Sequence, residues 1–141
     1  MTASRELRLT GWVLATAVIV SVVHYTDNTV RYDEYTQGVH TVISQPLIPI
    51  GWVVLTAAGI AGYHCLRRGS RRPAASLLAL YSVSGLIGPL HYTAAPPDAF
   101  DWLQNTFIAS DTLLGVALLV IAIRIATTTL ADRAGTTARA T

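Results

Sequence analysis

Long apolar runs separated by short polar segments dominate this chain. The runs cover residues 9–26, 47–66, 74–92 and 103–126. Each is close to the ~20 residues that a helix with a rise of ~1.5 Å per residue needs to cross a ~30 Å hydrocarbon core. The pattern predicts an all-α integral membrane protein, a four-helix transmembrane bundle that forms one domain over residues 1–141 and has a flexible tail at 131–141.

Composition supports the membrane class. The chain is 52% hydrophobic and 13% charged, whereas soluble domains carry about 25% charged residues. The sequence shows no folded domain with a basic surface, so we expect no nucleic-acid partner. The single cysteine, Cys65, excludes a disulfide or a multi-cysteine metal site within one chain.

The charged residues predict the orientation of the helices. Nine of the ten arginines lie at the N-terminus, between the second and third runs, or at the C-terminal end: Arg5, Arg8, Arg67, Arg68, Arg71, Arg72, Arg124, Arg133 and Arg139. The tenth, Arg31, lies on the other side with most of the acidic residues: Asp27, Asp33, Glu34, Asp98 and Asp101. The positive-inside rule then predicts a multi-pass plasma-membrane protein with both termini in the cytoplasm. We expect the first run to be a retained helix, because no small-residue cleavage site follows it.

One tripeptide occurs twice, as His24-Tyr25-Thr26 and His91-Tyr92-Thr93. Each copy stands at the end of an apolar run that is predicted to reach the outer leaflet. The two copies favour a parallel repeat of two helices, although chance similarity is an open alternative. Each tripeptide also ends a stripe of small and polar residues at helical spacing, with Ala17, Ser21, His24 and Asn28 in one stripe and Tyr81, Ser84, Gly88 and His91 in the other.

Two further residues shape the expected site. Pro89 should kink or loosen the third helix and free backbone carbonyls near Gly85. Asp111 lies about nine residues into the fourth helix, or ~13 Å below its start. A carboxyl group at that depth must find a partner, hold a proton or face water.

These features predict a polar pocket open toward the outer leaflet, with His24, His91 and Asp111 as acid/base residues. The connection 29–45 is expected to lie on the outer interface or to fold over the helix ends. The pocket would bind, and as an enzyme would act on, an amphiphilic or lipid-like small molecule. Its expected ligand-binding residues are Tyr25, Asn28, Tyr81, Ser84, Tyr92, Gln104 and Asn105.

Three alternatives stay open at this point. Each histidine could simply cap its helix end. A zinc, iron or copper site could use both histidines with Asp27, Asp111 or His40, although no closely spaced metal motif is present. The chain could also be a non-catalytic accessory subunit of a larger membrane complex, in which Asp111 would pair with a partner subunit. The sequence identifies no cofactor, and membrane lipids or further copies of the chain are the other expected partners.

Overall fold

The computed structural model describes residues 2–36 and 44–139, and that part of the chain contains helices and no strand. Two short 3-10 helices, η1 and η2, lie between the last two α-helices. The elements in chain order are α1 (Ala3–Val30), α2 (Tyr32–Thr36), α3 (Leu47–Arg67), α4 (Arg71–Leu86), η1 (Gly88–Thr93), η2 (Pro97–Ala99) and α5 (Trp102–Arg139).

Four segments are long and apolar enough to cross a membrane, which confirms the predicted all-α four-helix bundle of a multi-pass membrane protein. They are Ala3–Val30, Leu47–Arg67, Arg71–Thr93 and Trp102–Thr129. The last helix does not stop near residue 126, as its hydropathy suggested, but continues to Arg139 through most of the segment expected to be a tail. The structure describes none of residues 37–43, so His40 lies outside the described part of the chain.

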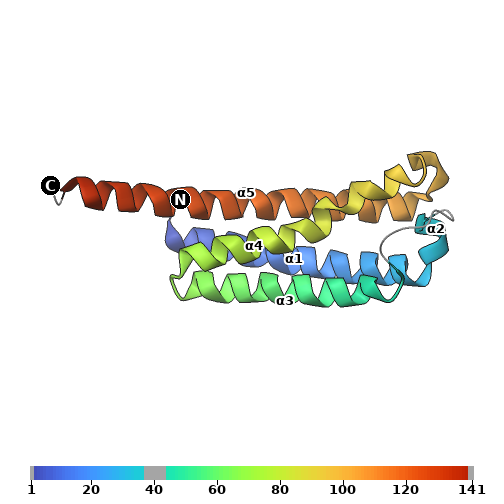
Figure 1. Ribbon diagram of the computed structural model, residues 1–141, viewed down its shortest axis with the longest axis horizontal. Coiled ribbons are helices and arrows are strands. Elements are labelled where there is room, and N and C mark those ends of the chain that lie inside the picture. Colours follow the sequence, from blue (N-terminus) through green and yellow to red (C-terminus); the bar gives the residue numbers. More distant parts are fainter. Residues whose placement is uncertain (1, 37–43, 140–141) are drawn as a thin grey trace.

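In the bundle, α1 packs against α3 and α5, and α4 packs against the same two helices. Figure 1 shows both termini at the same end as the turn between α3 and α4, which contains Arg68 and the positive-φ Gly69. We call this end the Arg-rich end. The opposite end holds α2, η1, η2 and the start of α5, and we call it the acidic end because Asp27, Glu34 and Asp101 lie there.

Apolar packing holds the Arg-rich half together. A buried cluster joins α3, α4 and α5 around Leu78 and Ile125, both of which are 0% exposed. A second cluster next to it places Leu14 of α1 against Tyr81 and Leu118. Close packing of these buried side chains fixes the four helices against one another. The positions of the helices in turn place the polar groups of the acidic half.

Helices α4 and α5 approach most closely where two glycines meet. A methyl group added to Gly85 would collide with the backbone carbonyl oxygen of Asp111, and one added to Gly115 would stand 2.9 Å from the carbonyl oxygen of Ser82. Small residues allow such backbone contact between membrane helices. The close approach sets Asp111 directly beside α4.

The third span is interrupted where Pro89 was expected to disturb it. Helix α4 ends at Leu86, and the chain continues as the 3-10 helix η1. Proline has no N–H group, so it cannot donate to the carbonyl of Gly85 four residues earlier. The Thr112 hydroxyl of α5 lies 3.3 Å from that carbonyl, but its single proton has a shorter contact, at 2.7 Å, with the carbonyl of Ile108 in its own helix. The predicted loosening near Gly85 is confirmed by the end of α4 at Leu86.

Candidate functional site

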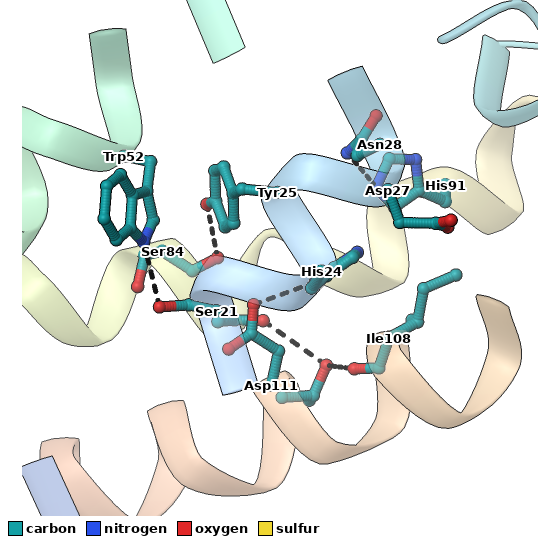
Figure 2. A network of polar contacts seen from close by, with 12 residues as sticks. Ser21, His24, Tyr25, Asp27, Asn28, Trp52, Ser84, His91, Ile108 and Asp111 are labelled. Atoms are coloured by element: carbon teal, nitrogen blue, oxygen red, sulfur yellow. Dashed lines mark hydrogen bonds and ion pairs between the residues drawn. The ribbon is translucent and has the colours of Figure 1, made fainter. Parts of the chain in front are cut away.

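The polar groups of the acidic half meet between α1, α5 and η1 (Figure 2). The small and polar stripe of α1 is buried as its spacing predicted, with Ala17, Ser21, His24 and Asn28 all facing the bundle. Asp111 reaches the same region from α5, and His91 reaches it from η1. Residues far apart in the sequence therefore form one polar centre.

His24 and Asp111 form a buried pair. The His24 Nδ1 atom lies 2.9 Å from Asp111 Oδ2, and the two side chains are each 3% exposed. Figure 2 shows them pointing toward one another across the space between α1 and α5. The carboxyl group thus has the partner that its depth in the helix required.

The second ring nitrogen of His24 has no such partner. Within the described residues, Nε2 is buried and makes no hydrogen bond. Since the two nitrogens lie on opposite sides of the imidazole, Nε2 points away from Asp111. Four rings surround His24 with centroid distances of 5.7 to 6.3 Å: those of Tyr25, Tyr35, His91 and Phe107.

His91 joins the centre by a separate contact. Its Nε2 atom lies 3.2 Å from the amide nitrogen of Asn28, and its ring centroid lies 5.9 Å from that of His24. His91 is half-buried, whereas His24 is 2% exposed. The structure therefore brings the two histidines together without a direct hydrogen bond between them.

Helix α2 covers this centre through Tyr35, which is 1% exposed. The Tyr35 ring packs 4.8 Å from the His91 ring, and its hydroxyl donates to Asp27 at 2.7 Å. Burial raises the pKa of the Tyr35 phenol, and the hydrogen bond to Asp27 raises that pKa further. The phenol is accordingly a protonated donor at neutral pH, and it fixes α2 over the histidines.

Three of the expected ligand-binding residues join helices by hydrogen bonds. The Tyr25 hydroxyl donates to the carbonyl of Ser84 at 3.0 Å, and the Ser84 hydroxyl donates to its own helix at Tyr81. The Tyr81 and Ser21 hydroxyls lie 3.3 Å apart, and Trp52 donates to Ser21 at 3.0 Å. These hydrogen bonds connect α1 with α3 and α4, and Figure 2 shows Trp52 beside Ser21 and Ser84.

Three more of the seven expected ligand-binding residues lie near the start of α5: Gln104 and Asn105 belong to α5 itself, and Tyr92 belongs to η1. Gln104 and Asp101 form a reciprocal cap, with Gln104 N to Asp101 Oδ1 at 2.8 Å and Asp101 N to Gln104 Oε1 at 3.0 Å. The backbone N–H of Gln104, which donates to the Asp101 carboxylate, lowers the pKa of Asp101, and the hydrogen bond from Arg31 lowers that pKa further. Asn105 donates to loop carbonyls such as that of Pro97 and accepts from Tyr92.

The centre itself is closed, whereas the sequence predicted a pocket open to the outer leaflet. A cavity of about 260 Å³ lies between α1 and α3 in the acidic half, and its lining includes Tyr25, Thr29 and Trp52. A second cavity of about 290 Å³ lies between α1 and α5 in the Arg-rich half. Neither of these two cavities is lined by His24, His91 or Asp111.

Two alternatives can be compared with this geometry. In the described part of the chain, no three His, Cys, Asp or Glu side chains converge as a metal site would require. The accessory-subunit interpretation expected Asp111 to pair with another protein, but Asp111 pairs with His24 of its own chain. The carboxyl group therefore has a hydrogen-bond partner within its own chain.

The sequence interpretation overlooked part of the shell around His24. Phe107 stacks on the imidazole at 6.3 Å, and it precedes Asp111 by four residues, so helical spacing alone places both on one face of α5. Tyr35 was assigned only to a connection that could fold over the helix ends, and no periodic signal marks its contact with His91.

Comparison with known proteins adds no relative, since the chain matches no family model, no curated protein and no solved structure.

Proposed function

We propose that the His24–Asp111 pair is an acid/base centre for a small amphiphilic or lipid-like molecule. One observation carries the proposal: a buried imidazole is held at 2.9 Å by a buried carboxylate on one nitrogen and has no partner among the described residues on the other. Burying a polar nitrogen without a partner costs free energy. A protein that keeps such a group often uses it to receive a ligand or a proton.

The chemistry follows from the two nitrogens. An ionised Asp111 only accepts hydrogen bonds, so Nδ1 of a neutral His24 carries the ring proton and donates a hydrogen bond to the carboxylate. This leaves a lone pair on Nε2, which can take a proton from a bound molecule. Asp111 would then stabilise the imidazolium that forms, and the proton could return to the molecule or pass onward. In this proposal, His24 is the base and Asp111 orients it.

The surroundings favour a ligand that is mostly apolar. The aromatic rings of Tyr35 and Phe107 flank His24, while His91 and the Asn28 amide supply the neighbouring polar groups. A molecule with a ring or chain and one exchangeable proton would match both features. Because Tyr35 covers the centre, access requires α2 to move, which would break the hydrogen bond from Tyr35 to Asp27.

We further propose that the acidic end faces outward. The support is the arginine distribution, since nine of the ten arginines lie toward the opposite end of the spans or beyond it. The centre would then lie in the outer half of the plasma membrane. Cysteines introduced at Ser70 and Asp98 in a Cys65→Ser background should react with a membrane-impermeant maleimide from the cytoplasmic and the outer side, respectively; the opposite pattern would overturn the orientation.

Analysis of co-purified molecules tests the proposed function. The chain purified from its native membrane should yield, on organic extraction and mass spectrometry, a non-phospholipid amphiphile enriched over bulk lipid. Asp111→Asn retains the shape of the side chain but loses its charge, and it should abolish this enrichment while expression is unchanged. Asp98→Asn changes an exposed carboxyl in η2 and should leave it intact. Equal recovery from the Asp111→Asn variant would contradict the proposal.

A further inference from the structure

The cavity in the Arg-rich half has a regular wall on each side. Its residues follow positions i, i+3, i+4 and i+7 on both helices, so each set forms one face. The cavity holds about 290 Å³ and is lined by Glu6, Leu9, Thr10 and Val13 of α1 and by Ala117, Val120, Ile121 and Arg124 of α5. The two charged residues occupy the same end, and apolar side chains dominate the rest of the groove.

Only one of these two charges is compensated within the described residues. The Glu6 carboxylate pairs with Arg71, whose Nη2 atom lies 3.0 Å from Glu6 Oε1. Arg71 also donates to Thr128 and Thr129, which holds the pair in place. Arg124 is exposed, and no described carboxylate lies within ion-pair distance of its guanidinium. The groove therefore has one unpaired positive charge at its end.

The depth of Arg124 suits the headgroup region of a bilayer. At a rise of ~1.5 Å per residue, Arg124 lies about 33 Å along α5 from Trp102, close to the ~30 Å thickness of the hydrocarbon core. Trp102 is exposed at the acidic end, where an aromatic residue commonly marks one interface. Arg124 then lies at the other interface, with the apolar part of the groove extending into the membrane.

We propose that this groove binds one anionic phospholipid, with its phosphate on Arg124 and an acyl chain along the apolar walls between α1 and α5. Charge complementarity selects an anionic headgroup over a zwitterionic one. A free phosphate ion would leave the apolar walls unfilled. The site lies in the half of the bundle opposite to His24, so it is independent of the proposed acid/base function.

Native mass spectrometry of the full chain in detergent tests this site. Titration with phosphatidylglycerol should give one tightly bound lipid, and phosphatidylcholine with the same acyl chains should bind about fivefold more weakly, as one basic side chain near an anionic headgroup predicts. Arg124→Gln should reduce the affinity for phosphatidylglycerol to the level of phosphatidylcholine. The control Arg72→Gln removes an exposed arginine of the same end outside the groove and should change neither affinity.

A second variant tests the apolar walls. Ala117→Leu places a larger side chain in the groove and should weaken the binding of both lipids, whereas Ala57→Leu on an exposed face of α3 should not. Circular dichroism and elution volume check the fold, and the Arg124→Gln result decides the proposal if Ala117→Leu does not fold. The proposal is overturned if Arg124→Gln retains the lipid preference, if Arg72→Gln removes it equally, if folded Ala117→Leu binds both lipids like the wild type, or if inorganic phosphate displaces phosphatidylglycerol at equal concentration.

Discussion

The two His-Tyr-Thr elements have the same side chains in the same order but occupy different environments. His24-Tyr25-Thr26 lies within the continuous helix α1, and its histidine is buried against a carboxylate. His91-Tyr92-Thr93 lies in η1 after the helix break, and its histidine is half-buried against an amide. The comparison shows that a shared motif does not fix a role, because the backbone that carries the motif decides which partners it meets.

The largest contrast should follow from removing each histidine. His24→Leu leaves the Asp111 carboxylate buried without its partner and should lower the free energy of unfolding by about 3 kcal/mol or more. His91→Leu removes a half-buried hydrogen bond between neutral groups and should cost about 1 kcal/mol. Unfolding in mixed micelles titrated with sodium dodecyl sulfate measures both values.

A double variant separates the buried pair from general packing. Adding Asp111→Leu to His24→Leu replaces both partners with apolar groups and should recover most of the lost stability. Similar losses for His24→Leu and His91→Leu, with no recovery in the double variant, would mean that the two elements are energetically equivalent.

The glycine beside Asp111 is the next most sensitive position. Gly85→Ala forces a methyl group onto the Asp111 carbonyl and should destabilise the protein by about 1–3 kcal/mol, because two helix backbones must separate. Gly51→Ala is the matched control, since a methyl group there meets open space and alanine favours helix by about 1 kcal/mol. In the same unfolding assay, Gly85→Ala should lower the free energy of unfolding and Gly51→Ala should raise it. Equal effects of the two substitutions would contradict the close approach of α4 and α5.

As with the histidines, the substitution in the first His-Tyr-Thr element should lower the free energy of unfolding more than the substitution in the second, but the difference should be smaller. Tyr25→Phe leaves the carbonyl of the buried Ser84 without its hydroxyl donor and should cost about 1 kcal/mol. Tyr92→Phe frees an Asn105 oxygen near the exposed loop, where water can replace the phenol, and should cost a few tenths of a kcal/mol. A larger loss for Tyr92→Phe would reverse the comparison.

Acid should weaken the Asp101 cap at the start of α5, close to the second His-Tyr-Thr element, and this effect should be the smallest of those predicted. The folded pKa of Asp101 is lowered by the backbone of Gln104 and by Arg31, so its stabilising contribution is present above the ordinary value of 3.8 and is lost as the pH falls through the lower folded value. The protection factors of the amides at the start of α5 against hydrogen exchange should therefore fall below pH 3.8. Asp101→Asn should remove this pH dependence of the protection factors, and Asp98→Asn should retain it. An unchanged profile in Asp101→Asn would exclude the cap as the cause.

Much of the fold was readable from the sequence because hydrocarbon imposes a strong pattern. Four apolar runs predicted four spans, the stripe through Ser21 and His24 predicted the buried face of α1, and Pro89 predicted the break after α4. The continuation of α5 to Arg139 was not predicted, because hydropathy reports where a helix leaves the membrane and not where it ends.

The partners within the site were harder to predict. Gln104 and Asp111 are both polar and lie on the same helix, yet Gln104 caps the start of α5 while Asp111 meets His24. Which partner each finds depends on the rotation of α5 about its axis and on the close contact at Gly85, and no local spacing encodes either. The contact of Tyr35 with both histidines likewise depends on how the chain turns after α1.

The protonation of the His24 ring tests the central claim most directly. Nitrogen-15 nuclear magnetic resonance on the histidine-labelled protein in lipid nanodiscs, assigned with His24→Gln and with His64→Gln as the control, reports which nitrogen carries the proton. At mildly alkaline pH we expect His24 to carry it on Nδ1, hydrogen-bonded to Asp111, with Nε2 unprotonated, and we expect Asp111→Asn to shift the Nδ1 signal. A proton on Nε2, or a His24 signal that does not respond to Asp111→Asn, would contradict the acid/base centre.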